Sequence, residues 1–248
     1  MSTVSYRAPR IITFSEDELP MTMQVAMIGS NGIVLASDMK WVTRLDADWR
    51  GPKRHHHFES KIRIDKDIAI CCAGDMIDSP QLADEILSHL REGKGDEMQR
   101  IREIVTPTRV DEREIECIVA FAPPNKKLIH IHNVLVRSET ETEPEWGLSV
   151  RHVRGGVQTA GDQANDAKFW LRYYDPSLSV QELKGLAVHL VVEAQNFNNA
   201  MIGGLEVVLS GPSGFYPLSE AECQNLEADA KSRARHIGEL IFRPPTHN

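Results

Sequence analysis

The chain has 248 residues, a net charge of −8 and an ordinary hydrophobic content, so it can form one domain, or at most two, with a sizeable core. It contains neither an apolar run of the roughly 18 residues that a membrane helix needs nor the pattern of a secretory signal. The acidic balance argues against nucleic acid as the main partner. Four cysteines without metal-ligand spacing favour a reducing compartment. We therefore expect a cytoplasmic protein with no membrane or nucleic-acid partner.

Residues 1 to 21 contain two prolines and an acidic cluster, which are typical of an N-terminal extension or a removable leader. Translation from Met21 is a third alternative, since a Met followed by a small residue is commonly trimmed. The sequence leaves the three alternatives open. We expect the folded domain to occupy residues 22 to 248.

A β-hairpin is predicted from Thr22 to Asp38. An apolar run with alternating character leads to Asn31-Gly32, a strong hairpin signal because both residues tolerate the positive φ of a tight turn. The first strand starts near the point where the second ends, so the Thr22 hydroxyl and the Asp38 carboxylate are predicted neighbours. A plain two-stranded edge explains the same pattern without any function.

Residues 40 to 59 are polar and poorly patterned, and we expect a solvated loop there. Three consecutive histidines, His55 to His57, lie within it. Consecutive histidines do not readily converge on one metal ion, and no Cys or acidic residue at helical spacing joins them. His130 and His132 share one face of a later strand but have no third ligand, so we expect no metal site at either place.

The rest of the chain alternates between strand and helix patterns. A helix is predicted from Ser79 and Pro80 to about Gly93, and capping boxes at Ser179 and Ser219 each begin a further helix. The remaining predicted elements are strands over 61–65, 68–74, 114–122, 127–136, 148–153, 156–159 and 205–210, and helices over 98–105 and 162–174. This order fits an α+β sandwich and not alternating βαβ units.

Three segments, in this order, resemble the proteasome family. They are Thr22 through Ala36-Ser37-Asp38, then Lys61-Ile62-Arg63-Ile64-Asp65 through Ala73-Gly74, and finally Gly203-Gly204 with the apolar strand that follows. The resemblance is to its bacterial proteasome-like, β-type subunits within the N-terminal nucleophile hydrolase superfamily. It implies a four-layer αββα sandwich, with two antiparallel sheets face to face and helices outside.

The same resemblance implies a threonine-type peptidase that needs no metal or cofactor. An N-terminal Thr supplies the nucleophile through its hydroxyl and the base through its free α-amine. The family's Lys and Asp fall on Lys61 and Asp38, and its backbone oxyanion donor falls on Gly74. Thr22 gains a free amine only when residues 1 to 21 are absent.

Some positions depart from the family pattern. The interval from Asp38 to Lys61 is longer than usual for the family, and the strand after Lys61 is one residue short. A bulge or a local gap is therefore needed if Lys61 is to face Thr22; otherwise Lys61 is a solvent-facing strand residue. Asp162 stands where the family often has Ser, and it either replaces that polar group or caps a helix. Asn199 and Ile202 stand where the family commonly has Asp and Ser, and these losses weaken the expectation of strong peptidase activity.

Three functions remain open. The first is a threonine peptidase that cuts peptides or unfolded proteins inside a self-compartmentalised homo-oligomeric ring, with an ATP-driven AAA+ unfoldase as a partner implied by the resemblance. The second is a non-catalytic structural subunit of the same fold. The third is an N-terminal nucleophile amidase that acts on a small amide.

Overall fold

The computed structural model describes residues 22–48, 51–74, 78–93, 95–108, 115–136, 145–161, 169–199 and 202–242. The predicted leader, residues 1 to 21, lies outside the described residues, so the boundary at Thr22 stays a prediction. The strands are β1 (Gln24–Ile28), β2 (Ile33–Ser37), β3 (Lys40–Asp48), β4 (Gly51–Phe58), β5 (Ile62–Asp65), β6 (Ile68–Gly74), β7 (Ile115–Phe121), β8 (Lys127–Val136), β9 (Glu145–His152), β10 (Val157–Ala160), β11 (Glu206–Gly211) and β12 (Gly214–Pro217). The helices are α1 (Asp78–Glu92), α2 (Glu97–Val105), α4 (Val180–Phe197) and α5 (Glu220–Phe242).

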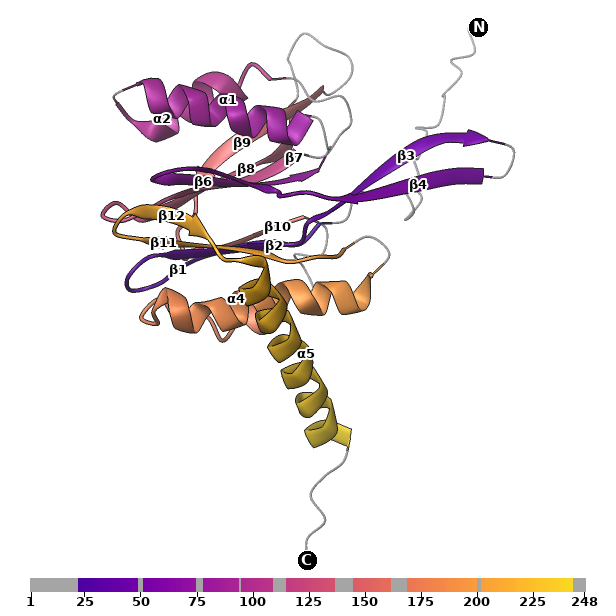
Figure 1. The fold of residues 1–248 in the computed structure, drawn as a ribbon. Coiled ribbons are helices and arrows are strands. Elements are labelled where there is room, and N and C mark those ends of the chain that lie inside the picture. Colours follow the sequence, from indigo (N-terminus) through magenta and orange to yellow (C-terminus); the bar gives the residue numbers. More distant parts are fainter. Residues whose placement is uncertain are drawn as a thin grey trace, which may run out of the picture.

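Two antiparallel five-stranded sheets form the centre of the molecule, as the sandwich prediction requires. One sheet has the strand order β10-β1-β2-β11-β12 and the other has the order β5-β6-β7-β8-β9. Figure 1 shows α1 and α2 over the outer face of the second sheet and α4 beneath the first sheet. The four-layer αββα arrangement is therefore confirmed.

Three apolar clusters hold these layers together. One joins the first sheet to α4 and α5, with Met23, Val25 and Leu190 among its members. A second joins the other sheet to α1 and α2. The third lies between the two sheets and includes Ile33 and Ile118. Alternate residues of β1 and β2 thus face a helix layer and the opposing sheet, which explains why both strands are apolar throughout.

The predicted hairpin is present, but its turn differs from the prediction. β1 and β2 pair in register from Gln24 opposite Ser37 to Ile28 opposite Ile33, which leaves a four-residue loop. Neither Asn31 nor Gly32 has a positive φ. Gly32 is required for space instead, because a Cβ there would lie 2.5 Å from the carbonyl oxygen of Ser210.

The region predicted as a loop over residues 40 to 59 is a two-stranded ribbon of β3 and β4, so the loop prediction is wrong. His55, His56 and His57 are paired residues of β4. The ribbon joins neither five-stranded sheet and projects from their edge (Figure 1). A strand that is not part of the central sheets need not show the period-two apolar pattern that marks a half-buried strand.

The helix signals are largely confirmed. Both capping boxes form: Ser179 and Glu182 begin α4, and Ser219 and Glu222 exchange hydrogen bonds before α5. Helix α1 begins one residue before the predicted cap, and Ser79 donates to the carbonyl of Ala73 instead. No helix in the described part of the chain is both long and apolar enough to cross a membrane.

Candidate active site

Thr22 lies two residues before the start of β1, beside the point where β2 ends. Asp38 follows β2, and the hairpin register brings the two positions together. The Met23 amide donates to Asp38 Oδ1 at 3.0 Å, and the Asp38 amide donates to the Met23 carbonyl at 3.1 Å. Both Thr22 and Asp38 are buried, with 2 % and 0 % of their surface exposed. Thr22 and Asp38 are therefore neighbours in the structure, as predicted.

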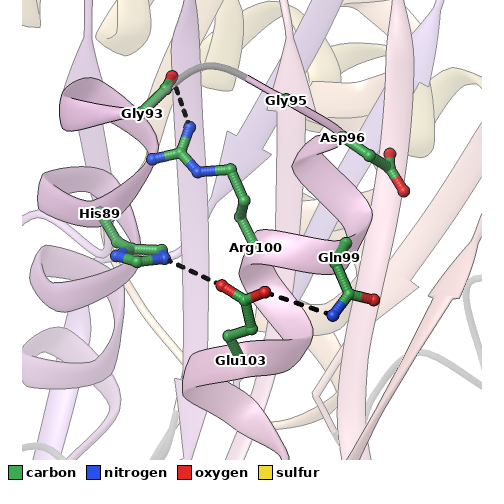
Figure 2. A pocket seen from close by; sticks show the side chains of 7 residues that line it. All are labelled: His89, Gly93, Gly95, Asp96, Gln99, Arg100 and Glu103. Carbon is green, nitrogen blue, oxygen red and sulfur yellow. Dashed lines mark hydrogen bonds and ion pairs between the residues drawn. The ribbon is translucent and has the colours of Figure 1, made fainter.

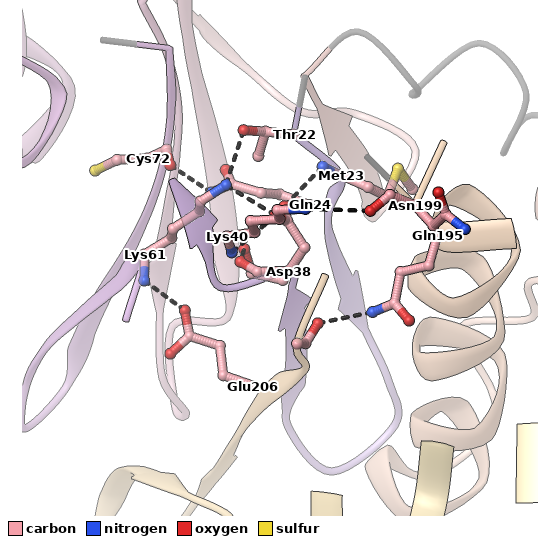
Figure 3. Close-up of polar contacts among 12 residues, drawn as sticks. Thr22, Met23, Gln24, Asp38, Lys40, Lys61, Cys72, Gln195, Asn199 and Glu206 are labelled. Atoms are coloured by element: carbon pink, nitrogen blue, oxygen red, sulfur yellow. Dashed lines mark hydrogen bonds and ion pairs between the residues drawn. The ribbon is translucent and has the colours of Figure 1, made fainter. Parts of the chain in front are cut away.

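Lys61 connects these two groups. Its Nζ donates to Thr22 Oγ1 at 3.0 Å and to Asp38 Oδ2 at 2.9 Å, and Figure 3 shows its side chain between them. Nζ also lies 4.9 Å from the centre of the Trp41 ring. Only 2 % of Lys61 is exposed, so the alternative of a solvent-facing lysine is wrong.

The bulge expected near Lys61 is absent from β5. Ile62 to Asp65 pair with β6 without a register shift, and Ile62 enters the core between the sheets. Lys61 precedes this strand, and its carbonyl accepts from the Cys72 amide. Its long, unbranched side chain therefore reaches across to the first sheet without any irregularity in β5.

Burial shifts both charges of this ion pair towards neutrality. Loss of water lowers the pKa of Lys61 below its usual range, and the Asp38 carboxylate opposes that shift. Burial also raises the pKa of Asp38, against the attraction of Lys61 and two backbone hydrogen bonds. A lysine with a lowered pKa beside a hydroxyl is typical of sites where a proton must move.

Gly161, at the end of β10, fixes the position of Thr22 from the other side. It has a φ of +90°, and a Cβ at this position would lie 2.1 Å from the Thr22 carbonyl oxygen. The Gly161 amide donates to Glu116 Oε2 at 2.6 Å. Glu116 in turn contacts His130 Nε2 at 2.5 Å. The second sheet thus holds the backbone against which Thr22 packs, and His130 is the buried partner of Glu116 within that sheet.

Gly74 ends β6 with a φ of +112°, one strand away from Lys61. Among the described residues no hydrogen bond joins Gly74 to Thr22, so its role as oxyanion donor stays a prediction. Two residues earlier, the Cys72 carbonyl accepts from Gln24 Nε2 at 2.5 Å. This bond ties β6 to β1 beside Thr22.

The three departures from the family pattern have different outcomes. Asp162 lies outside the described residues. Asn199 is exposed, and its backbone carbonyl accepts from Lys40 Nζ at 3.1 Å. The Ile202 side chain is buried in the cluster beneath the first sheet, where it supplies apolar packing, and its backbone amide donates to the Asn198 carbonyl at 3.0 Å.

Sequence reasoning missed several polar residues of the site. The most prominent is Glu206, in β11, which accepts from the backbone amide of Lys61 at 2.6 Å. A carboxylate in an otherwise apolar strand, LEVVLS, was the available signal, because such a strand buries charge only with partners. Four other residues can be recognised as part of the site only once the two sheets are placed face to face: Gln24, Trp41, Glu116 and Gly161.

A separate cavity of about 440 Å³ lies between α1 and α2, on the outer side of the second sheet (Figure 2). Arg100 lines this cavity, and its guanidinium donates to the carbonyls of Leu90 and Gly93 at the end of α1. Arg100 therefore caps the carboxyl end of α1, which explains its presence without a ligand. The cluster around Thr22 is therefore the better candidate for chemistry.

Comparison with known proteins shows the fold alone. No protein-family model and no curated protein sequence matches the chain. Its structure is similar to that of Anbu (ancestral beta-subunit) from Yersinia bercovieri, with a TM-score of 0.61, 12% identity, and coverage of 92% of this chain and 100% of that chain. An Anbu mutant from Hyphomicrobium sp. strain MC1 has a TM-score of 0.58 and 14% identity, and the match covers 92% and 99% of the two chains.

These findings correct the family assignment expected from sequence. The motifs around Thr22, Lys61 and Gly203 predicted a member of the proteasome family, but the chain matches no family model, and its structural neighbours share only 12–14% of its residues. The motifs therefore identified the architecture and not the family. The fold is proteasome-related.

Proposed function

We propose that the chain is a threonine-type N-terminal nucleophile hydrolase that cuts peptide bonds, with Thr22 as the nucleophile. One observation supports this most strongly: Lys61 Nζ, almost wholly buried, lies 3.0 Å from Thr22 Oγ1 and 2.9 Å from Asp38 Oδ2. A hydroxyl, an ammonium and a carboxylate in contact, away from water, are the set that such a reaction needs.

In this mechanism the Thr22 hydroxyl attacks the carbonyl carbon of the scissile amide. Its proton passes to the free α-amine of the same residue, directly or through water, and from there to the leaving amine. Lys61 favours the unprotonated amine and stabilises negative charge on Oγ1 as it develops. Asp38 holds the ammonium in place. Hydrolysis of the ester on Thr22 then regenerates the enzyme.

The proposal requires a free α-amine at Thr22. In the full-length chain the Thr22 nitrogen is part of the peptide bond to Met21, so the full-length chain lacks the base. Cleavage before Thr22, or translation from Met21 followed by trimming, supplies the free amine.

The test uses a chain that begins at Thr22, released from a cleavable fusion, with the full-length chain beside it. Fluorogenic peptides should be turned over by the Thr22-initiated chain and not by full-length protein, and Thr22→Ala should remove the activity. Thr22→Ser, which retains a hydroxyl, should keep part of it. Equal activity in Thr22→Ala would end the proposal.

A non-catalytic subunit of the same fold is the second candidate, and one observation favours it. Asn199 is exposed and Ile202 is buried in an apolar core, so neither offers the supporting hydroxyl or carboxylate expected there. This candidate predicts a stable full-length chain by intact mass. An amidase acting on a small amide uses the same chemistry at Thr22, and a substrate panel separates it from a peptidase.

A further inference from the structure

Glu206 is a carboxylate close to the Lys61–Asp38 ion pair, and the proposed hydrolysis gives this carboxylate no role. It begins β11, where it pairs with Ser37, the residue before Asp38. Its Oε1 accepts from the Lys61 amide at 2.6 Å, and its Oε2 lies 2.6 Å from Ser60 Oγ. Figure 3 shows Glu206 reaching the backbone of Lys61 from the side opposite Thr22. Glu206 thus joins β11 of the first sheet to the segment that leads into β5.

The hydrogen bonds of Ser60 indicate that Glu206 can hold a proton here. Ser60 Oγ has one hydrogen but two acceptors within reach, Glu206 Oε2 at 2.6 Å and the Ile62 carbonyl at 2.9 Å. If Glu206 is ionised, it also accepts from the Ile62 amide, but the single Ser60 hydrogen reaches only one of its two acceptors. If Oε2 carries a proton, it donates to Ser60 Oγ and Ser60 donates to Ile62, so every group is satisfied.

The charges around Glu206 oppose each other. The Asp38 carboxylate repels the charge of Glu206, and the charge of Glu206 in turn stabilises Lys61 as an ammonium. The buried thiols of Cys71, in β6, and Cys223, in α5, also interact with it. Burial is the largest influence and raises the pKa of Glu206 to about 7. The carboxylate therefore gains or loses its proton near neutral pH.

We propose that Glu206 is a positioning residue for the proposed hydrolysis. It holds the Lys61 backbone so that Nζ faces Thr22, and its ionisation keeps Lys61 an ammonium. This inference rests on the proposed function. When Glu206 is ionised, its charge favours the protonated Lys61 that stabilises the Thr22 oxyanion. When it is neutral, Lys61 keeps its backbone partner but loses that electrostatic support.

The activity test compares the pH profile of kcat/KM in the Thr22-initiated chain and its Glu206→Gln variant. Gln keeps an acceptor for the Lys61 amide but does not ionise. The wild-type acid limb should contain two ionisations, those of the Thr22 amine and Glu206, and E206Q should contain one, with a shallower limb. Glu206→Ala, which loses the acceptor as well, should lower kcat about tenfold or more with KM little changed. Glu193→Gln in α4 is the matched control.

A second measurement does not depend on turnover. With lysine carrying ¹³C at Cε, the signal of Lys61, assigned from its loss in Lys61→Arg, should shift near pH 7 as Glu206 ionises, and E206Q should abolish the shift. Absence of turnover with the shift present would contradict the proposed function and not the positioning. A signal that titrates identically in E206Q, or pH profiles of equal slope, would overturn the role of Glu206.

Discussion

At Lys61 an ammonium side chain lies out of water between a hydroxyl and a carboxylate. Desolvation of two charges costs several kcal/mol, and the pair recovers this cost only through close geometry and further hydrogen bonds. Asp38 has those bonds, from the amides of Met23 and Lys40. The arrangement adds little net stability, and we regard it as retained for chemistry.

Lys61→Met should destabilise the fold by about 3–5 kcal/mol, because it leaves the Asp38 charge buried without a partner. Asp38→Asn should rescue much of that loss in the double variant, since the amide oxygen still accepts from Met23 without a charge. Chemical denaturation of both single variants and the double variant measures the coupling. Additive losses would show that the two side chains do not act as a pair.

Gly161→Ala should destabilise the fold by about 1–3 kcal/mol, since the residue has φ of +90° and a Cβ would meet the Thr22 carbonyl. The same change should displace Thr22 and lower turnover in the Thr22-initiated chain. Gly155→Ala is the matched control, because a Cβ there meets nothing within 4 Å. Equal stability in the two variants would contradict the close approach to Thr22.

At the scale of elements, Glu206 joins β11 to the segment before β5, and this link makes stability depend on pH. The pKa of Glu206 is raised from 4.5 to about 7 in the folded chain. Between these values the unfolded chain has released a proton that the folded chain retains, so stability falls as pH rises. The full effect is about 3 kcal/mol, present as stability below pH 4.5 and lost above pH 7.

Glu206→Gln should therefore lose less stability than wild type between pH 4.5 and 7.5, and the difference should approach about 3 kcal/mol. Urea denaturation across this range, with Glu193→Gln as the control, measures the effect. Parallel stability curves for wild type and E206Q would show that Glu206 ionises in the folded chain as it does in the unfolded one.

Elements whose pattern arises from local chemistry were predictable from sequence. The capping boxes at Ser179 and Ser219 and the apolar alternation after Thr22 depend on neighbours a few residues away. The β3–β4 ribbon was missed because residues 40 to 59 are rich in charged and polar side chains, which hid the strand pattern. Its length also explains the long interval between Asp38 and Lys61, without any bulge in β5.

Side chains that meet across the sandwich were harder to predict. Lys61 and Asp38 were identified by the resemblance to strand-end motifs, since nothing in their spacing alone brings β2 and β5 together. Glu206 and Gly161 depend on the packing of one sheet on the other. A single sequence records that a charged residue lies in an apolar strand, but not which partner it meets.

At the scale of the whole molecule, the described residues of the site lie where β1 begins and β2 ends, beside the start of β5. We propose on the proteasome-related fold that copies of this chain assemble into rings, with peptides or unfolded proteins as substrates and an ATP-driven unfoldase as partner. Size-exclusion chromatography with light scattering should then give a particle of several hundred kilodaltons. A monomer of 27.9 kDa would remove compartmentalised proteolysis and leave the chemistry at Thr22 to be tested alone.

The most direct test of the central claim is the covalent bond that the site forms with an electrophile. A Thr22-initiated chain treated with a peptide β-lactone and mapped by mass spectrometry should carry one ester, on Thr22. The thiols of Cys71, Cys72 and Cys223 are buried with raised pKa values, so they should not compete. The adduct should be absent from Thr22→Ala and strongly reduced in Lys61→Met. An unmodified Thr22, or equal labelling in Lys61→Met, would contradict the account.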